Sequence, residues 1–143
     1  MSPEEARRRF TQARVARLAT AAADGRPHVV PIVFAVAERS GQGVIYSVVD
    51  DKPKRTTALQ RLANVAENPR VSVLVDHYEE AWDRLWWVRA DGAGRLLTDP
   101  SGPEAAAAVA LLQARYPQQR AIGTVLAVDV ERWSGWAATA PGG

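Results

Sequence analysis

The sequence predicts an α+β domain in which a curled antiparallel sheet closes into a small barrel with about three helices around it. Six expected strands and three expected helices follow one another with short links throughout, and their order indicates a small antiparallel barrel rather than parallel βαβ units. The length of 143 residues suits one domain, and 47% hydrophobic and 24% charged residues are ordinary globular values. We therefore expect residues 1–143 to form one domain, with 139–143 as a flexible tail.

The chain is expected to begin with a helix and a β-hairpin. An N-cap serine, a proline at the first helical position and two acids predict a helix over about 3–13. Residues 15–21 and 28–36 are the predicted strands of the hairpin. Pro31 lies inside the second strand, and because proline has no backbone donor, this position must lie at an edge, a bulge or an opening of the ladder.

The remaining elements are predicted from hydrophobic periodicity and from turn residues. The fifth strand should continue past Gly92 and Gly94 to residue 97, since glycines inside a strand mark a bend in a curled sheet. We expect helices over about 56–66 and 103–114, and strands over 44–49, 71–76, 85–90 and 123–130.

Composition excludes several classes of function. The sequence has no cysteine, so disulfides and thiolate chemistry are excluded, and two histidines are too few to predict a metal site. No segment resembles a signal peptide or a membrane span, which makes the cytoplasm the expected location. A net charge of +2 without a basic stripe argues against a nucleic-acid partner, although a basic barrel for single strands is an alternative.

The strongest functional signal is a basic segment at the start of the second predicted helix. Free N–H groups and the helix dipole attract anions there. Arg61 lies one turn further along the same face, which favours a phosphate site over the alternative of a solvated loop with a threonine cap. The segment combines cations and hydroxyls: Lys52, Lys54, Arg55, Thr56 and Thr57.

Five tryptophans are the second unusual feature. Trp86 and Trp87 are adjacent in a predicted strand, so their rings must point to opposite faces of the sheet. One ring can fill the barrel while the other meets a partner subunit or a flat ring system.

Sequence motifs over Arg14–Trp133 resemble a known family. VARLATAAADGRPHVVPIVFAV, the basic helix start, ENPRVSVLVDHY and LWWVRADG resemble the split β-barrel flavin and deazaflavin oxidoreductases related to pyridoxamine 5′-phosphate oxidase, the FMN-binding split-barrel type. The combination DDKPKRT…NPRVSVLVDHYEEAWDRLWWVRADG is similar to the mycobacterial-type subgroup that uses the deazaflavin coenzyme F420. The resemblance implies a homodimer with two cofactor sites at the subunit interface.

The same resemblance implies which residues bind the cofactor. Those expected along the ring system are Pro31, Ile32 and Val33. Those expected at the phosphate and acidic tail are Ser47, Lys52, Lys54, Arg55 and Thr56, with Arg61 and Asn64 extending the contact along the helix. Trp86 or Trp87 is expected to form a wall of the partner's pocket. Arg61 stands where many relatives have lysine, so a forked donor replaces a point charge.

The implied activity is hydride transfer between the F420 ring and a small organic substrate that the sequence does not identify. The implied proton source is water, Tyr46, His77 or Tyr78. Two alternatives remain open: an FMN-dependent oxidase or reductase of the same fold, and a non-enzymatic protein that binds F420 or a tetrapyrrole.

Overall fold

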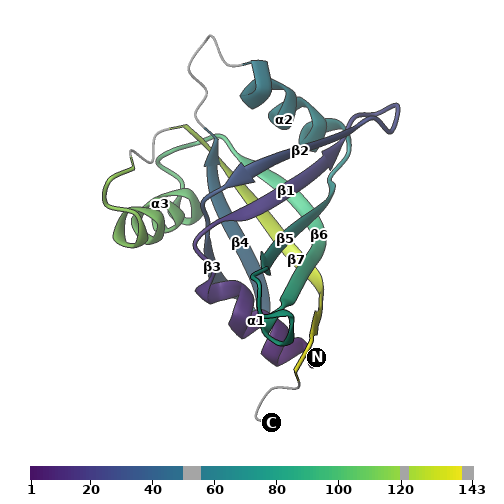
Figure 1. The fold of residues 1–143 in the computed structure, drawn as a ribbon. Helices are drawn as coiled ribbons and strands as arrows, with labels where there is room; N and C mark the ends of the chain where they lie inside the picture. The colour runs from purple at the N-terminus through teal and green to yellow at the C-terminus, as the bar shows by residue number, and fades with distance from the viewer. Residues whose placement is uncertain (50–55, 120–122, 140–143) are drawn as a thin grey trace.

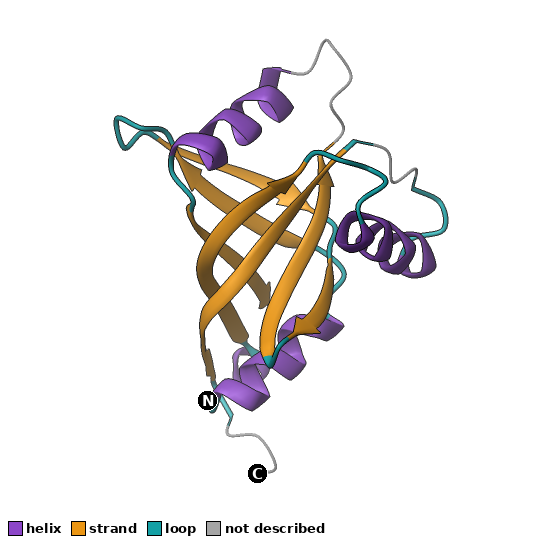
Figure 2. Cartoon of the chain, turned by 180° about the vertical axis from the view of Figure 1, so that it is seen from behind, coloured by secondary structure: helices purple, strands orange, loops and turns teal. Residues whose placement is uncertain are grey.

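The computed structural model describes residues 1–49, 56–119 and 123–139, so the predicted tail lies mostly outside the described residues. Within these ranges the chain forms three α-helices, one short 3-10 helix and seven strands of a single antiparallel sheet (Figures 1 and 2). This confirms the predicted α+β split barrel. The helices are α1 (Pro3–Gln12), α2 (Thr56–Glu67), η1 (Trp82–Arg84) and α3 (Pro103–Arg115). The strands are β1 (Ala16–Ala21), β2 (Pro27–Ile32), β3 (Ala35–Arg39), β4 (Gln42–Val49), β5 (Arg70–His77), β6 (Trp86–Leu97) and β7 (Thr124–Ala137).

The strand order explains why the sheet curls into a barrel. Neighbouring strands follow the order β2-β1-β5-β6-β7-β4-β3, which puts β2 and β3 at the two edges. β2 ends at Ile32 and β3 begins at Ala35, and so short a link spans at most about 11 Å. The two edges must therefore meet at this end, where the barrel is split. Pro31, paired with Arg17 of β1, lies on an edge strand, which is one of the three positions predicted for it.

The predicted strand over 28–36 is wrong in one respect, because the structure divides it into β2 and β3 and so has seven strands instead of six. The chain leaves one edge of the sheet at Val33 and Phe34 and joins the other edge at Ala35. A continuous apolar run cannot reveal such a change of edge, since both halves of the run contain buried apolar residues.

One face of the sheet encloses the main hydrophobic core. It is filled by alternate residues of the strands, such as Leu18, Val73 and Leu126, all of which are at most 1% exposed. α1 lies at one end of the barrel and α2 over the other (Figure 1). Phe10 of α1 enters this core, with its ring 4.9 Å from the ring of Phe34, and α1 is capped by Ser2 as predicted.

β6 and β7 bend around the barrel at a bulge. The register shifts between Asp91, which pairs with Arg132, and Gly92, which pairs with Val130. A Cβ atom on Gly92 would lie 2.1 Å from the Asp129 carbonyl oxygen, so only glycine fits there. The predicted glycine-marked bend is confirmed. The last strand is longer than predicted, because beyond the bulge it continues to pair with β6 as far as Ala137.

α3 covers only part of the outer face of the sheet. Its buried residues Ala108 and Leu112 pack with Val44, Tyr46 and Ala127 on β4 and β7. In Figure 2 this helix lies to one side of the barrel. In the described ranges no helix covers the outer face of β2, β1, β5 and β6. No described helix is long and apolar enough to cross a membrane.

Candidate functional site

A cavity of about 290 Å³ lies where the barrel is split. The structure brings together here five of the residues predicted to bind a cofactor, namely Pro31, Ile32, Val33, Ser47 and Arg61. They come from β2, the link that follows it, β4 and α2, which meet at the point where the chain changes edges. The sequence did not indicate the three other lining residues, Val15, Val48 and Gln119.

Ser47 joins the two sides of the split. The side chain is 3% exposed, and its hydroxyl group donates a 2.9 Å hydrogen bond to the Val33 carbonyl oxygen. This bond connects β4 to the link between β2 and β3. The link lies outside both strands, so the Val33 carbonyl oxygen bonds to a side chain instead of to a neighbouring strand. Oxygen lone pairs of the hydroxyl remain able to accept a hydrogen bond from a ligand.

Arg61 brings a positive charge to an otherwise mostly apolar cavity. Its Nε atom is buried and, among the described residues, has no hydrogen-bond partner. No ion pair joins Arg61 to any described carboxylate, and burial lowers the pKa of its guanidinium group. A half-buried cation in this state is costly unless an anion binds beside it. The side chain therefore favours a negatively charged ligand.

Asn64 follows Arg61 by three residues on α2, but the structure gives it a different environment. Its side chain is 2% exposed; its Nδ2 atom donates to the Thr20 hydroxyl at 3.0 Å, and its Oδ1 atom accepts from Gln60 at 2.7 Å. Asn64 does not line the cavity. In the described structure its amide attaches α2 to β1, rather than facing the cavity as the resemblance implied.

The other predicted contacts of the anionic tail remain predictions. Lys52, Lys54 and Arg55 lie outside the described residues, and Thr56 is the first residue of α2. What the structure does establish is that a helix begins directly after this basic segment. A helix start of this kind has unpaired N–H groups that attract anions.

Trp86 and Trp87 point to opposite faces of β6, as the sequence predicted. Trp86 packs against the barrel core, with the Arg9 guanidinium 5.4 Å from its ring centre and the His77 ring at 6.4 Å. Trp87 lies on the outer face. Neither ring lines the cavity at the split within one chain.

A second hollow, of about 610 Å³, follows the uncovered outer face of the sheet. We call it the outer groove. Its walls are largely apolar and include Val29, which is 61% exposed, and Tyr78, which is 67% exposed. Arg17 and Asp76 lie 3.6 Å apart in it. The other lining residues are Ala19, Ser72, Leu74, Trp87 and Arg89.

The three candidate proton donors lie away from the cavity at the split. His77 pairs with Glu79 near the surface, and Tyr78 belongs to the outer groove. Tyr46 is 3% exposed beneath α3 and donates a 2.6 Å hydrogen bond to Glu104. Burial and the Glu104 carboxylate raise the pKa of Tyr46, so this hydroxyl group stays protonated and is poorly suited to proton transfer.

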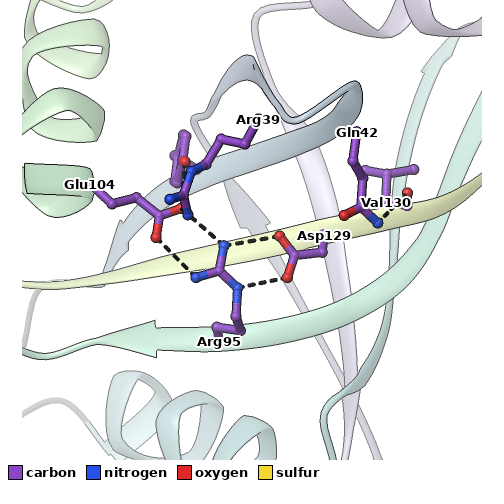
Figure 3. A network of polar contacts seen from close by, with 7 residues as sticks. Arg39, Gln42, Arg95, Glu104, Asp129 and Val130 are labelled. Atoms are coloured by element: carbon purple, nitrogen blue, oxygen red, sulfur yellow. Dashed lines mark hydrogen bonds and ion pairs between the residues drawn. The ribbon is translucent and has the colours of Figure 1, made fainter.

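The same Glu104 is the centre of an ion network that joins α3 to the sheet (Figure 3). The Arg95 guanidinium donates two 2.9 Å hydrogen bonds to Glu104 and two, of 2.6 and 2.9 Å, to Asp129. Arg39 lies 2.7 Å from Glu104. Arg95 is the main reason that the pKa of Glu104 falls to about 2. The network balances two positive and two negative charges, which makes it a structural clamp.

Comparison with known proteins agrees with this architecture. The sequence profile of the family described as "Pyridoxamine 5'-phosphate oxidase" matches residues 2–137. No curated protein sequence matches the chain.

Three solved structures illustrate the range of similar proteins. A FAD-binding protein from Mesorhizobium loti is 27% identical, with a TM-score of 0.70, and the match covers 94% of this chain and 92% of that one. A conserved hypothetical protein from Mycobacterium tuberculosis is 22% identical, with a TM-score of 0.71 and coverage of 96% and 86%. HutZ, the heme storage protein from Vibrio cholerae, is 18% identical, with a TM-score of 0.64 and coverage of 96% and 95%. The last two likenesses concern the fold alone.

Proposed function

Since the chain belongs to the pyridoxamine 5′-phosphate oxidase family, we propose that it is an oxidoreductase that holds coenzyme F420 at the split of its barrel. In this proposal, the substrate is a small organic molecule. The observation that carries it is Arg61, a half-buried cation at a mostly apolar cavity, whose Nε atom has no hydrogen-bond partner in the part of the chain that the structure describes. An apolar wall beside a half-buried cation suits a planar ring system with an anionic tail.

Different residues of the cavity would contact different parts of the cofactor. Pro31, Ile32 and Val33 offer an aliphatic surface from an edge strand, and Ser47 fixes the Val33 carbonyl. Arg61 supplies positive charge, to which the sequence adds the basic residues that precede α2. When bound, the deazaflavin ring supplies the hydride chemistry, so these protein groups need only bind, orient and exclude water.

The size of the cavity supports a site that two subunits share. Ligand sites usually enclose about 300–1,000 Å³, and 290 Å³ is at the small end of this range. The outer groove is mostly apolar and is left uncovered by the described helices. In our proposal, a second copy of the chain covers this face and, through Trp87 or a neighbour, adds a wall to the cofactor site.

A sedimentation experiment tests the dimer separately from the cofactor. The expected mass is twice the 15.5 kDa of one chain. Leu74→Asp, on the uncovered face, should give the monomer, while Leu111→Asp, on exposed α3, should stay dimeric. A monomeric wild-type protein would remove the shared site.

A flavin is the second candidate cofactor, supported by the FAD-binding protein that is 27% identical over most of both chains. A tetrapyrrole has less support. The described residues that line the cavity at the split include no histidine, the side chain most often used as an axial ligand of haem.

Titration of the protein with F420 and with FMN, followed by tryptophan fluorescence, tests the proposal. We expect F420 to bind more tightly and Arg61→Ala to weaken it about 10- to 100-fold, the usual value of a charged hydrogen bond. Lys54→Ala should weaken it too. Arg70→Ala is the matched control, because the Arg70 side chain is 83% exposed and lies 3.9 Å from its partner Glu131.

Each other outcome has a definite meaning. Preference for FMN would keep the fold and replace the deazaflavin chemistry. Binding of F420 without turnover of any compound in a substrate panel would favour a carrier. Failure to bind either cofactor would refute the proposal.

A further inference from the structure

The backbone of Phe34 is held by side chains rather than by a neighbouring strand. Phe34 lies in the link where the chain changes edges, so no ladder supplies its hydrogen bonds. The Phe34 carbonyl oxygen accepts hydrogen bonds from the Arg115 guanidinium at 2.9 Å and the Tyr116 hydroxyl at 3.0 Å. The Phe34 N–H donates weakly to the same hydroxyl at 3.4 Å. Residues at the C-terminal end of α3 thus supply the hydrogen bonds that a neighbouring strand would otherwise make with Phe34.

The same two side chains hold the link between α1 and β1. The Tyr116 hydroxyl lies 2.9 Å from the Arg14 carbonyl oxygen, and Arg115 also donates to the Ala13 carbonyl oxygen. A tyrosine hydroxyl has a single proton, so the carbonyl groups of Arg14 and Phe34 share it. The two links are therefore coupled through one buried oxygen atom, since Tyr116 is only 3% exposed.

These bonds lie directly beside the cavity at the split. Val15 follows Arg14 and Val33 precedes Phe34, and both valines line the cavity. Gln119, a third lining residue, donates its backbone N–H to the Tyr116 carbonyl oxygen at 3.0 Å. Stacking reinforces the arrangement, with the Arg115 guanidinium 4.9 Å from the Phe34 ring centre.

We propose that Arg115 and Tyr116 are positioning residues of the cofactor site. Their hydrogen bonds set the distance between Val15 and Val33 and hold Gln119 at the wall of the cavity. They do not line the cavity themselves. Their effect on binding is indirect, through the width of the cavity that receives the ring system. This inference rests on the proposed function.

Tyr116→Phe tests the inference because it removes one oxygen atom and keeps the ring. The matched control is Glu104→Gln, which loosens the other end of α3 where it contacts Arg95 and Arg39. Arg115→Lys is a second variant in case Tyr116→Phe fails to fold. Lysine keeps the charge but replaces the two guanidinium nitrogens that contact Phe34 and Ala13 by a single nitrogen. All three variants are first compared by their urea midpoints.

The first measurement needs no cofactor. Amide hydrogen exchange of residues 32–35, taken relative to the slowest-exchanging amides of the same variant, should become at least about tenfold faster in Tyr116→Phe and in Arg115→Lys. It should change less than twofold in Glu104→Gln. Unchanged exchange in both positioning variants would overturn the inference, whatever the protein binds.

The second measurement is the affinity for F420 and for FMN. The dissociation constant of the preferred cofactor should rise about tenfold in Tyr116→Phe, while Glu104→Gln stays within twofold of wild type. Faster exchange with unchanged affinity would show that the pair is only structural and would overturn the inference. If the wild-type protein binds neither cofactor, the proposed function fails, and the exchange experiment alone decides whether Arg115 and Tyr116 hold these walls.

Discussion

Replacing Glu104 by glutamine should lower the free energy of unfolding by about 2 kcal/mol at pH 7. Glutamine keeps the shape of the side chain and removes its charge. The carboxylate accepts two 2.9 Å hydrogen bonds from Arg95 and one of 2.6 Å from Tyr46, and lies 2.7 Å from Arg39. The variant therefore leaves Arg95 with Asp129 as its only remaining carboxylate partner among the described residues (Figure 3).

The magnitude follows from the pKa of the carboxyl group. Hydrogen bonding to Arg95 is the main cause that lowers this pKa from 4.5 to about 2, a difference worth about 3 kcal/mol at full strength. Glu104 is mostly buried, but the side chains of Arg95 and Arg39 are 36% and 53% exposed, so solvent screening reduces the value to roughly 2 kcal/mol. This corresponds to a decrease in Tm of about 5–7 °C.

The sign of the pH dependence separates charge from packing. Because the folded-state pKa is depressed, the stabilisation is fully present above pH 4.5 and is lost as the pH falls towards 2. Urea unfolding at pH 7 and at pH 3 should therefore show a smaller difference between wild type and variant at the lower pH. Glu38→Gln is the control, since Glu38 is 59% exposed and 3.7 Å from Arg7, and it should cost less than about 0.5 kcal/mol. An equal loss at both pH values would refute the electrostatic reasoning.

Three further predictions concern single side chains. Gly92→Ala should cost about 3 kcal/mol or prevent folding, because its Cβ would lie 2.1 Å from a carbonyl oxygen, whereas Gly102→Ala, with 3.3 Å to its nearest atom, should change the urea midpoint little. Arg61→Met should raise the free energy of unfolding of the ligand-free protein by about 1 kcal/mol, since it removes a half-buried cation; a decrease would mean that the cation is already paired. Asn64→Ala should lower the thermal midpoint through the loss of about 2 kcal/mol and leave the cofactor affinity of the folded protein unchanged; a large loss of affinity would instead support a direct contact.

Part of the candidate site could be predicted because its constraints are local. The missing donor of Pro31 restricts that residue to an edge, a bulge or an opening, and the structure places it on edge strand β2. Helical periodicity predicted that Arg61 lies near the start of α2. The alternation of side chains along a strand predicted that Trp86 and Trp87 point to opposite faces of the sheet. These conclusions need only the geometry of one element.

Other parts of the site depend on contacts between distant segments. Val15 and Gln119 come to the cavity from two links that are about a hundred residues apart, and no pattern in either link marks them. Periodicity predicted which face of the helix carries Asn64, but it could not show that Thr20 of β1 packs against that face and bonds to Asn64. For the same reason, the sequence could not show that neither tryptophan reaches the cavity within one chain.

By itself, the sequence determined the fold class, the three α-helices, most of the strands, the glycine bend in β6 and the restriction of Pro31 to an edge, a bulge or an opening of the ladder. Each of these follows from propensities, turn residues and periodicities that act over a few residues. Only the tertiary structure decided where the barrel splits, which residues meet there and that Arg115 and Tyr116 hold the junction. Such features arise when the edges of the sheet close on each other, and closure depends on packing across the whole chain rather than on any local stretch of it.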